Sequence, residues 1–129
     1  MKTVILSIVL IANLQAASLT YPNGKVEYFT AEKSRSLHNR IYYRNGLINK
    51  KTTYQDSREI YVSFKTLKNL KQFSQMYQLK PIKITNQKFN TVLFKLHNST
   101  DVLKLCSEIN KNQNVRYAKP NWRAPRIIN

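Results

Sequence analysis

The sequence predicts an α+β domain over residues 58–122, in which four strands and two helices follow the order β-α-β-β-α-β. Segments in which apolar and polar residues alternate, typical of half-buried strands, recur along this range. Two segments have apolar residues three and four positions apart, typical of amphipathic helices. One follows the first strand in the chain, and the other precedes the last strand. Short connections of this kind favour a ferredoxin-like arrangement, a four-stranded antiparallel sheet with both helices on one face.

The first half of this order lies in residues 60–85. Alternation from Ile60 to Lys65 predicts the first strand. Thr66 is expected to cap a helix over residues 67–78. The apolar positions of that helix share one face: Leu67, Leu70, Phe73 and Tyr77. Residues 80–85 are predicted to form a short strand, with Pro81 near its start or at a sheet edge.

The second half lies in residues 90–122. Residues 90–96 alternate as a strand, and Ser99 or Thr100 is expected to cap the second helix, which ends at residues 110–114. Its inward positions are Val102, Leu105, Cys106 and Ile109. In the last strand Val115 and Tyr117 are predicted to face the helices, while Arg116 and Ala118 face away from them.

The sheet face away from the helices is the candidate functional surface. The residues predicted to line it are Tyr61, Ser63, Leu93, Lys95, Arg116 and Ala118. These positions are compatible with an ordinary solvent-facing surface. Tyr61 and Leu93 favour a docking surface instead, because an open sheet with apolar members is a common binding platform.

Residues 1–17 have the features of a secretory signal peptide. Lys2 precedes an apolar run over residues 4–14, and the small residues Ala16, Ala17 and Ser18 follow it. The run is too short to span a membrane, although an uncleaved anchor is the alternative. We therefore expect a secreted or periplasmic protein with no stable membrane insertion after cleavage. Export argues against nucleic acid as a partner.

Residues 18–57 are predicted to form a β-hairpin arm. Two similar sequences, Tyr21-Pro22-Asn23-Gly24-Lys25 and Tyr42-Tyr43-Arg44-Asn45-Gly46, are each followed by residues that favour strands. Asn-Gly tolerates the positive φ angles of a type I′ turn. Residues 31–39 are polar and are expected to be a connector with little fixed structure.

The end of the last strand carries a resemblance to a known family. Val115-Arg116-Tyr117-Ala118-Lys119-Pro120-Asn121-Trp122, after a helix closed by an Asn-x-Asn sequence, resembles the end of the propeptide that precedes the catalytic domain of subtilisin-type serine proteases. The resemblance covers residues 58–122. Residues 123–129 are too few for a protease domain, so we expect a propeptide-like domain that stands alone with an extended C-terminal tail.

The resemblance implies an inhibitor or folding chaperone of a subtilisin-like serine protease, since in such propeptides the open sheet face packs on the protease and the tail lies in its substrate cleft. The implied sheet-face contacts are Tyr61, Leu93, Lys95 and Arg116. The implied tail contacts are Pro120, Asn121, Trp122, Ile127, Ile128 and Asn129. The tail departs from the usual pattern, because Arg126 stands four residues from the end, where an apolar residue is usual. Trp122 or the Ile127-Ile128 pair is the candidate apolar anchor.

Other chemistries have little support in the sequence. His38, His97 and Cys106 lack the neighbours that catalysis or metal binding requires, so we expect no enzyme, no metal site and no cofactor. The formal charge of +16, from 22 Lys and Arg against 6 Asp and Glu, leaves one alternative: a cationic protein that binds anionic lipid or polysaccharide. A non-functional remnant of a truncated protease precursor is the other.

Overall fold

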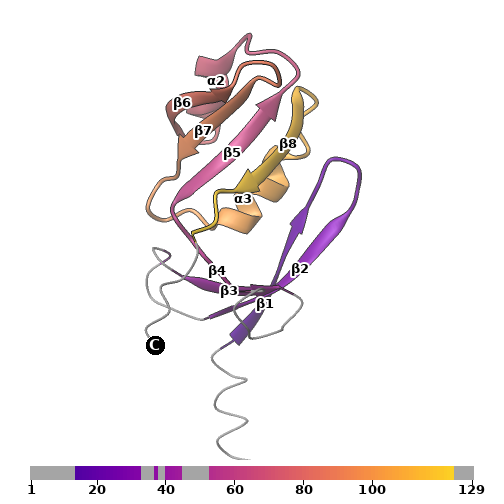
Figure 1. Ribbon diagram of the computed structural model, residues 1–129, viewed down its shortest axis with the longest axis vertical. Coiled ribbons are helices and arrows are strands. Elements are labelled where there is room, and N and C mark those ends of the chain that lie inside the picture. The colour runs from indigo at the N-terminus through magenta and orange to yellow at the C-terminus, as the bar shows by residue number, and fades with distance from the viewer. Residues whose placement is uncertain (1–13, 33–36, 38–39, 45–52, 124–129) are drawn as a thin grey trace, which may run out of the picture.

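The computed structural model describes residues 14–32, 37, 40–44 and 53–123, which contain two β-sheets (Figure 1). The N-terminal sheet consists of β1 (Leu14–Thr20), β2 (Val26–Glu32), β3 (Ile41–Arg44) and β4 (Thr53–Gln55). The C-terminal region consists of β5 (Glu59–Phe64), α2 (Leu70–Met76), β6 (Lys80–Asn86), β7 (Thr91–Lys95), α3 (Val102–Ile109) and β8 (Val115–Pro120). The predicted β-α-β-β-α-β order is therefore present in the C-terminal region.

The sheet of the C-terminal region has the strand order β6-β7-β5-β8, with antiparallel pairing throughout. Chain neighbours β5 and β6 do not pair, because α2 carries the chain past the central strands to the sheet edge. Both helices lie behind the sheet in Figure 1. One face of the sheet is therefore packed on helices and the other is uncovered, which confirms the predicted α+β fold.

The core of the C-terminal region lies between the sheet and its two helices. The central strands β5 and β7 contribute five buried apolar side chains, Ile60, Val62, Phe64, Val92 and Phe94. The helices contribute Phe73, Val102, Leu103, Cys106 and Ile109. Burying each larger apolar side chain stabilises the fold by about 1.5–3 kcal/mol, so the helix face of the sheet supplies most of this region's stability.

The second helix begins later than the sequence predicts. Asp101 caps α3, in place of Ser99 or Thr100, because its carboxylate accepts hydrogen bonds from the backbone N–H groups of Leu103 and Lys104, each at 3.1 Å. A carboxylate at this position also interacts favourably with the helix dipole.

The first helix is shorter than predicted. Asn69 has a φ of 69°, in the left-handed region, and α2 begins only at Leu70. The hydroxyl of Thr66 accepts from the N–H of Lys68 at 3.2 Å, outside the helix. Leu67 nevertheless packs against the core. The apolar spacing therefore identified the side chains that pack on the core, of which Phe73 is buried and the other three are partly buried, but extended the helix too far.

The last strand differs from the prediction beyond Arg116. Arg116 is an extra residue in β8, so the pairing with β5 shifts and Ser63 lies opposite Tyr117. A bulge of this kind moves the alternation of side chains by one position. Ala118 is consequently buried in the core, contrary to the prediction, and Tyr117 lies on the uncovered face.

The predicted hairpin arm forms a four-stranded antiparallel sheet in the order β1-β2-β3-β4. The N–H of Tyr21 donates to the carbonyl of Lys25 at 2.9 Å, and that of Gly24 to the carbonyl of Tyr21 at 3.0 Å. Within this loop, whose residues are all described, only Gly24 has a positive φ, of 86°. A type I′ turn requires two such residues, so the predicted turn type is wrong. The second predicted turn, Asn45-Gly46, lies outside the described residues.

Part of the predicted connector belongs to the N-terminal sheet. β2 extends to Glu32, and Ala31 pairs with Tyr42 of β3. Ala31 is fully buried and belongs to the core. The expectation of little fixed structure is therefore wrong for residues 31 and 32. Residues 33–36, 38 and 39 lie outside the described residues.

The N-terminal sheet docks on α3. The N–H of Thr20 donates to the hydroxyl of Ser107 at 3.1 Å, and the side-chain amide of Asn110 donates to the carbonyl of Thr20 at 2.9 Å. Asn110 also bonds both backbone groups of Ala118, at 2.6 and 3.1 Å. One amide side chain therefore joins α3 to β1 and to the outer edge of β8.

β1 includes the last residues of the predicted signal peptide. Ala17 pairs with Phe29 of β2, so the expected cleavage position lies within a strand, and cleavage there stays a prediction. Residues 1–13 lie outside the described residues. Neither helix of the described part of the chain has the length and apolar character needed to traverse a lipid bilayer.

Candidate functional site

The uncovered sheet face carries a row of four side chains, one from each strand. Tyr61 of β5 pairs with Leu93 of β7 and with Lys119 of β8, and Leu93 pairs with Lys83 of β6. Directly opposed residues of an antiparallel pair point to the same face. An aromatic and an aliphatic side chain therefore lie at the centre of this face, between two exposed lysines.

The structure brings three of the four predicted sheet-face residues together. Tyr61 is half-buried and Leu93 is 7% exposed. Lys95 is exposed and lies two residues after Leu93 on β7, on the same face. Arg116 is exposed at the bulge of β8, where it lines a shallow hollow with the hairpin loop that contains Tyr21. Arg116 therefore lies beside the N-terminal sheet and away from the central row.

Sequence reasoning missed two residues of this face, Tyr117 and Lys119. The ammonium group of Lys119 lies 5.3 Å from the ring centroid of Tyr117, within the range of a cation–π contact. Tyr117 was predicted to face the helices, and Lys119 was not assigned to a face, because the bulge at Arg116 has no marker in the sequence.

Hydrogen bonds hold the first residue after β8 in place. The N–H of Asn121 donates to the carbonyl of Glu59 at 2.9 Å, and its side-chain amide donates to the Glu59 carboxylate at 3.1 Å. The hydroxyl of Ser57 donates to the carbonyl of Asn121 at 2.5 Å. Pro120 is buried and pairs with Ile60. Pro120 and Asn121, two of the six predicted tail residues, are therefore fixed against the start of β5.

Trp122 belongs to an aromatic cluster in the N-terminal sheet. Its ring centroid lies 5.2–5.7 Å from those of three rings, Phe29, Tyr42 and Tyr54. Arg123 then exchanges two backbone hydrogen bonds of 2.9 Å with Gln55 of β4. The remaining predicted tail residues, Ile127, Ile128 and Asn129, lie outside the described residues.

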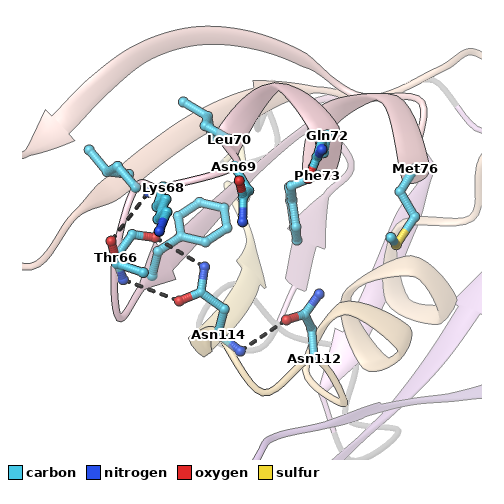
Figure 2. Close-up of a pocket in the computed structure, with 11 residues that line it drawn as sticks. Thr66, Lys68, Asn69, Leu70, Gln72, Phe73, Met76, Asn112 and Asn114 are labelled. Carbon is cyan, nitrogen blue, oxygen red and sulfur yellow. Dashed lines mark hydrogen bonds between the residues drawn. The ribbon is translucent and has the colours of Figure 1, made fainter.

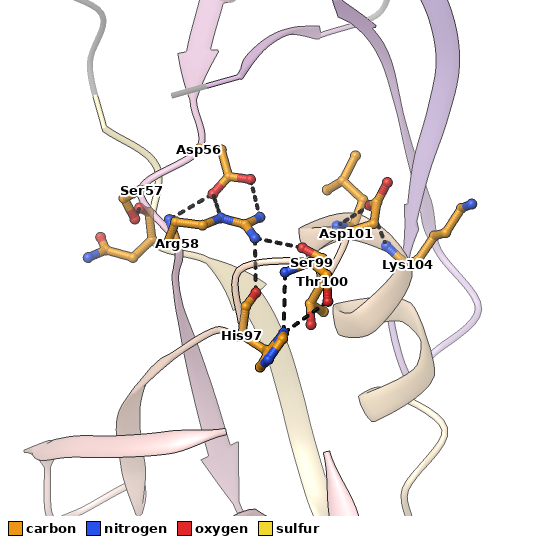
Figure 3. Close-up of polar contacts among 10 residues, drawn as sticks. Asp56, Ser57, Arg58, His97, Ser99, Thr100, Asp101 and Lys104 are labelled. Carbon is orange, nitrogen blue, oxygen red and sulfur yellow. Dashed lines mark hydrogen bonds and ion pairs between the residues drawn. The ribbon is translucent and has the colours of Figure 1, made fainter. Parts of the chain in front are cut away.

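A buried ion pair lies at the junction between the two regions (Figure 3). Asp56 is 1% exposed and Arg58 is 4% exposed. The Nε of Arg58 donates to Asp56 Oδ1 at 3.1 Å, and its guanidinium donates to the carbonyls of His97 and Thr100 at 3.2 and 2.7 Å. Arg58 has a φ of 63°, in the left-handed region. This network fixes the start of β5 against the loop that precedes α3.

A small hollow lies between α2 and the loop after α3 (Figure 2). It has a volume of about 170 Å³, and Phe64 and Phe73 contribute to its lining. Asn114 bonds the backbone N–H and carbonyl of Thr66 at 3.2 and 3.0 Å across its rim. These bonds join two loops, and the hollow lies on the helix side of the sheet, away from the central row.

Cys106 and His97, two of the residues considered for catalysis, lie in the core and in the loop before α3 and not in the central row of the uncovered face. Cys106 is buried in the core, and burial raises the pKa of its thiol. His97 Nδ1 lies 2.9 Å from the hydroxyl of Ser99, while His38 lies outside the described residues. Within residues 14–32, 37, 40–44 and 53–123, no three His, Cys, Asp or Glu side chains are grouped so as to hold a metal ion.

The fold, with one uncovered sheet face and an anchored C-terminal strand, is that of a propeptide-type domain. Residues 50–121 match the family described as the fervidolysin N-terminal prodomain, and the chain belongs to this family of subtilisin-type prodomains. No match was found among curated proteins or among solved structures. A propeptide-like role follows, and such domains are generally non-catalytic. The matched range includes β4 to β8 and ends immediately before Trp122.

Proposed function

We propose that this protein binds a subtilisin-type serine protease as its inhibitor, its folding chaperone or both. The observation that carries this proposal is the prodomain match over residues 50–121, which contain an uncovered sheet face with Tyr61 and Leu93 at its centre. We propose the extracellular space or the periplasm as the location, as is typical of the prodomains of secreted proteases.

The uncovered sheet face is the proposed docking surface. Aromatic side chains near the centre of an interface supply much of its binding energy, which suits Tyr61 beside Leu93. The lysines around them, Lys83, Lys95 and Lys119, would form the polar rim. The formal charge of +16 would speed the encounter with an acidic protease.

Residues 124–129 are the proposed cleft-binding segment. An extended strand pairs its backbone with the edges of a cleft and directs alternate side chains into pockets. Pro125 reduces the ordering cost because its φ is already restricted. Since Trp122 packs in the aromatic cluster, we favour the Ile127-Ile128 pair, followed by Asn129, as the cleft-binding end.

Inhibition of a purified subtilisin-type protease tests both contacts. Tyr61→Ala should weaken inhibition by about tenfold, the usual scale for removing a central aromatic residue. Tyr28→Ala is the matched control, because Tyr28 is 63% exposed on the other sheet. Deletion of residues 124–129 should weaken competitive inhibition while the circular dichroism spectrum is retained. Equal inhibition by all four proteins would contradict the proposed docking mode.

A second function is favoured by the lysines that flank the central row. Lys83 and Lys119 are exposed on one face, where they would suit an anionic lipid or polysaccharide surface. Binding to vesicles of anionic lipid that is lost on adding salt, with no effect on proteases, would support this alternative. Salt-resistant inhibition would exclude it.

A further inference from the structure

Trp122 lies just beyond the prodomain match, and its ring contacts come from strands of the N-terminal sheet. Two of the three rings, Phe29 and Tyr42, belong to β2 and β3, which precede the matched residues 50–121. The ring of Tyr42 is 1% exposed, and Trp122 is partly buried against the core. The N-terminal sheet therefore holds the residue with which the C-terminal tail begins.

The backbone at the next residue is held as well. The N–H and the carbonyl of Arg123 bond the carbonyl and the N–H of Gln55, both at 2.9 Å. This antiparallel bridge lies on the edge strand β4. A two-point backbone contact next to a packed side chain defines the direction of the chain, not only its position.

The N-terminal sheet is itself fixed to the C-terminal region at a second place. Asn110 and Ser107 of α3 bond the backbone of Thr20, on β1. β1 and β4 are the two edge strands of the N-terminal sheet, so the contacts to α3 and to Arg123 lie on opposite edges. The N-terminal sheet is therefore attached to the C-terminal region both at α3 and at the residues that follow β8 (Figure 1).

We propose that Trp122 is a positioning residue, through which the N-terminal sheet sets the direction in which the chain leaves Arg123 toward the protease cleft. This inference rests on the proposed function. A segment that leaves in a defined direction loses less conformational freedom on binding than one that starts from a free strand end. The N-terminal sheet would thus act on inhibition without touching the protease.

A double-mutant cycle on the full chain separates positioning from general stability. Trp122→Ala should weaken inhibition about tenfold, and Trp122→Phe, which retains ring packing, should restore most of it. When residues 124–129 are deleted, Trp122→Ala should have no further effect, because the residue acts through the tail. The proposal would be overturned if Trp122→Ala weakened inhibition equally in the full chain and in the chain without residues 124–129. Tyr28→Ala is the control variant for inhibition. Protection of the β5 and β7 amides from hydrogen exchange checks that each variant is folded.

Hydrogen exchange in the free protein gives a readout that needs no protease. The amides of Gln55 and Arg123 should exchange at least about tenfold more slowly in the wild type than in Trp122→Ala. Fast exchange of both amides in the wild type would overturn the anchor. Protected amides with no inhibition of any protease would support the anchor and contradict the proposed function, so the two failures are distinguishable.

Discussion

The two sheets of this protein bury their apolar residues in different ways. The C-terminal sheet packs on α2 and α3, and most residues of the core shared by both sheets lie between 60 and 118. The N-terminal sheet has no helix of its own in the described part of the chain. Its buried face packs on α3 and on Trp122. The C-terminal region therefore supplies most of this common core, and we expect the N-terminal sheet to depend on that region more than the reverse.

The largest expected effect tests this one-way dependence. Phe94→Ala should destabilise both regions by about 3–5 kcal/mol, because it creates a cavity in the core that supports α3. Phe29→Ala should cost a similar amount for the N-terminal sheet alone. Residue-resolved hydrogen exchange would distinguish the two. Loss of protection in β5 and β7 of Phe29→Ala would contradict the asymmetry.

The junction between the regions is expected to show the next largest effect. Arg58→Ala leaves the Asp56 carboxylate buried without its partner, which should cost about 3–5 kcal/mol. The exposed pair Glu108–Lys111, with an N–O distance of 3.2 Å, is the matched comparison. Lys111→Ala should change stability by well under about 1 kcal/mol. Urea unfolding of both variants measures this, and similar midpoints would contradict a structural role for the buried pair.

High pH should destabilise the protein, and part of that loss comes from Tyr42 in the N-terminal sheet. Burial, followed by the charges of Asp101 and Asp56, raises the pKa of Tyr42 from its usual value of about 10 to about 12. Tyr42 ionises at a lower pH in the unfolded chain than in the folded one. Its contribution to the free energy of unfolding is therefore complete below pH 10 and is lost as the pH rises toward 12. The loss is up to about 3 kcal/mol. Urea titrations across this range should give a flatter profile for Tyr42→Phe, and identical slopes would count against the shift.

The smallest effect concerns a cap within the C-terminal region. Asp101→Ala removes the acceptor for two backbone N–H groups at the start of α3 and should cost about 1 kcal/mol. Asp101→Asn, which keeps an oxygen acceptor, should lose less. Thermal unfolding would rank the two variants. Because α3 also supports β1, a larger loss of amide protection in the N-terminal sheet than in β5 and β7 would show that this sheet depends on α3.

The element order was predictable because alternation and helical spacing are local properties of the sequence. Ile60, Val62 and Phe64 lie in the core as their pattern indicates. The phase of β8 was not predictable beyond Arg116, because Val115, Tyr117 and Ala118 all suit a buried position and nothing local marks the bulge. A one-residue shift then reversed which side chains face outward.

Contacts between distant segments were the other limit of the sequence. Trp122 and Tyr42 are far apart in the chain, and the aromatic cluster exists only once both sheets have formed. Asp56 and Arg58 are only two residues apart, but Arg58 also donates to the carbonyls of His97 and Thr100, which lie far along the chain. On the candidate surface, Tyr61, Leu93 and Lys95 lie on the uncovered face as predicted. Their contact with a protease stays a prediction.

The most direct test of the account is a titration of the full chain into a panel of subtilisin-type proteases, with a small peptide as substrate. Binding through the sheet face and the cleft predicts dose-dependent inhibition that is competitive with the peptide. It should persist at high salt, because the proposed central contact, made by Tyr61 and Leu93, would be apolar. No inhibition of any protease by a protein with protected β5 and β7 amides would contradict the inhibitor role.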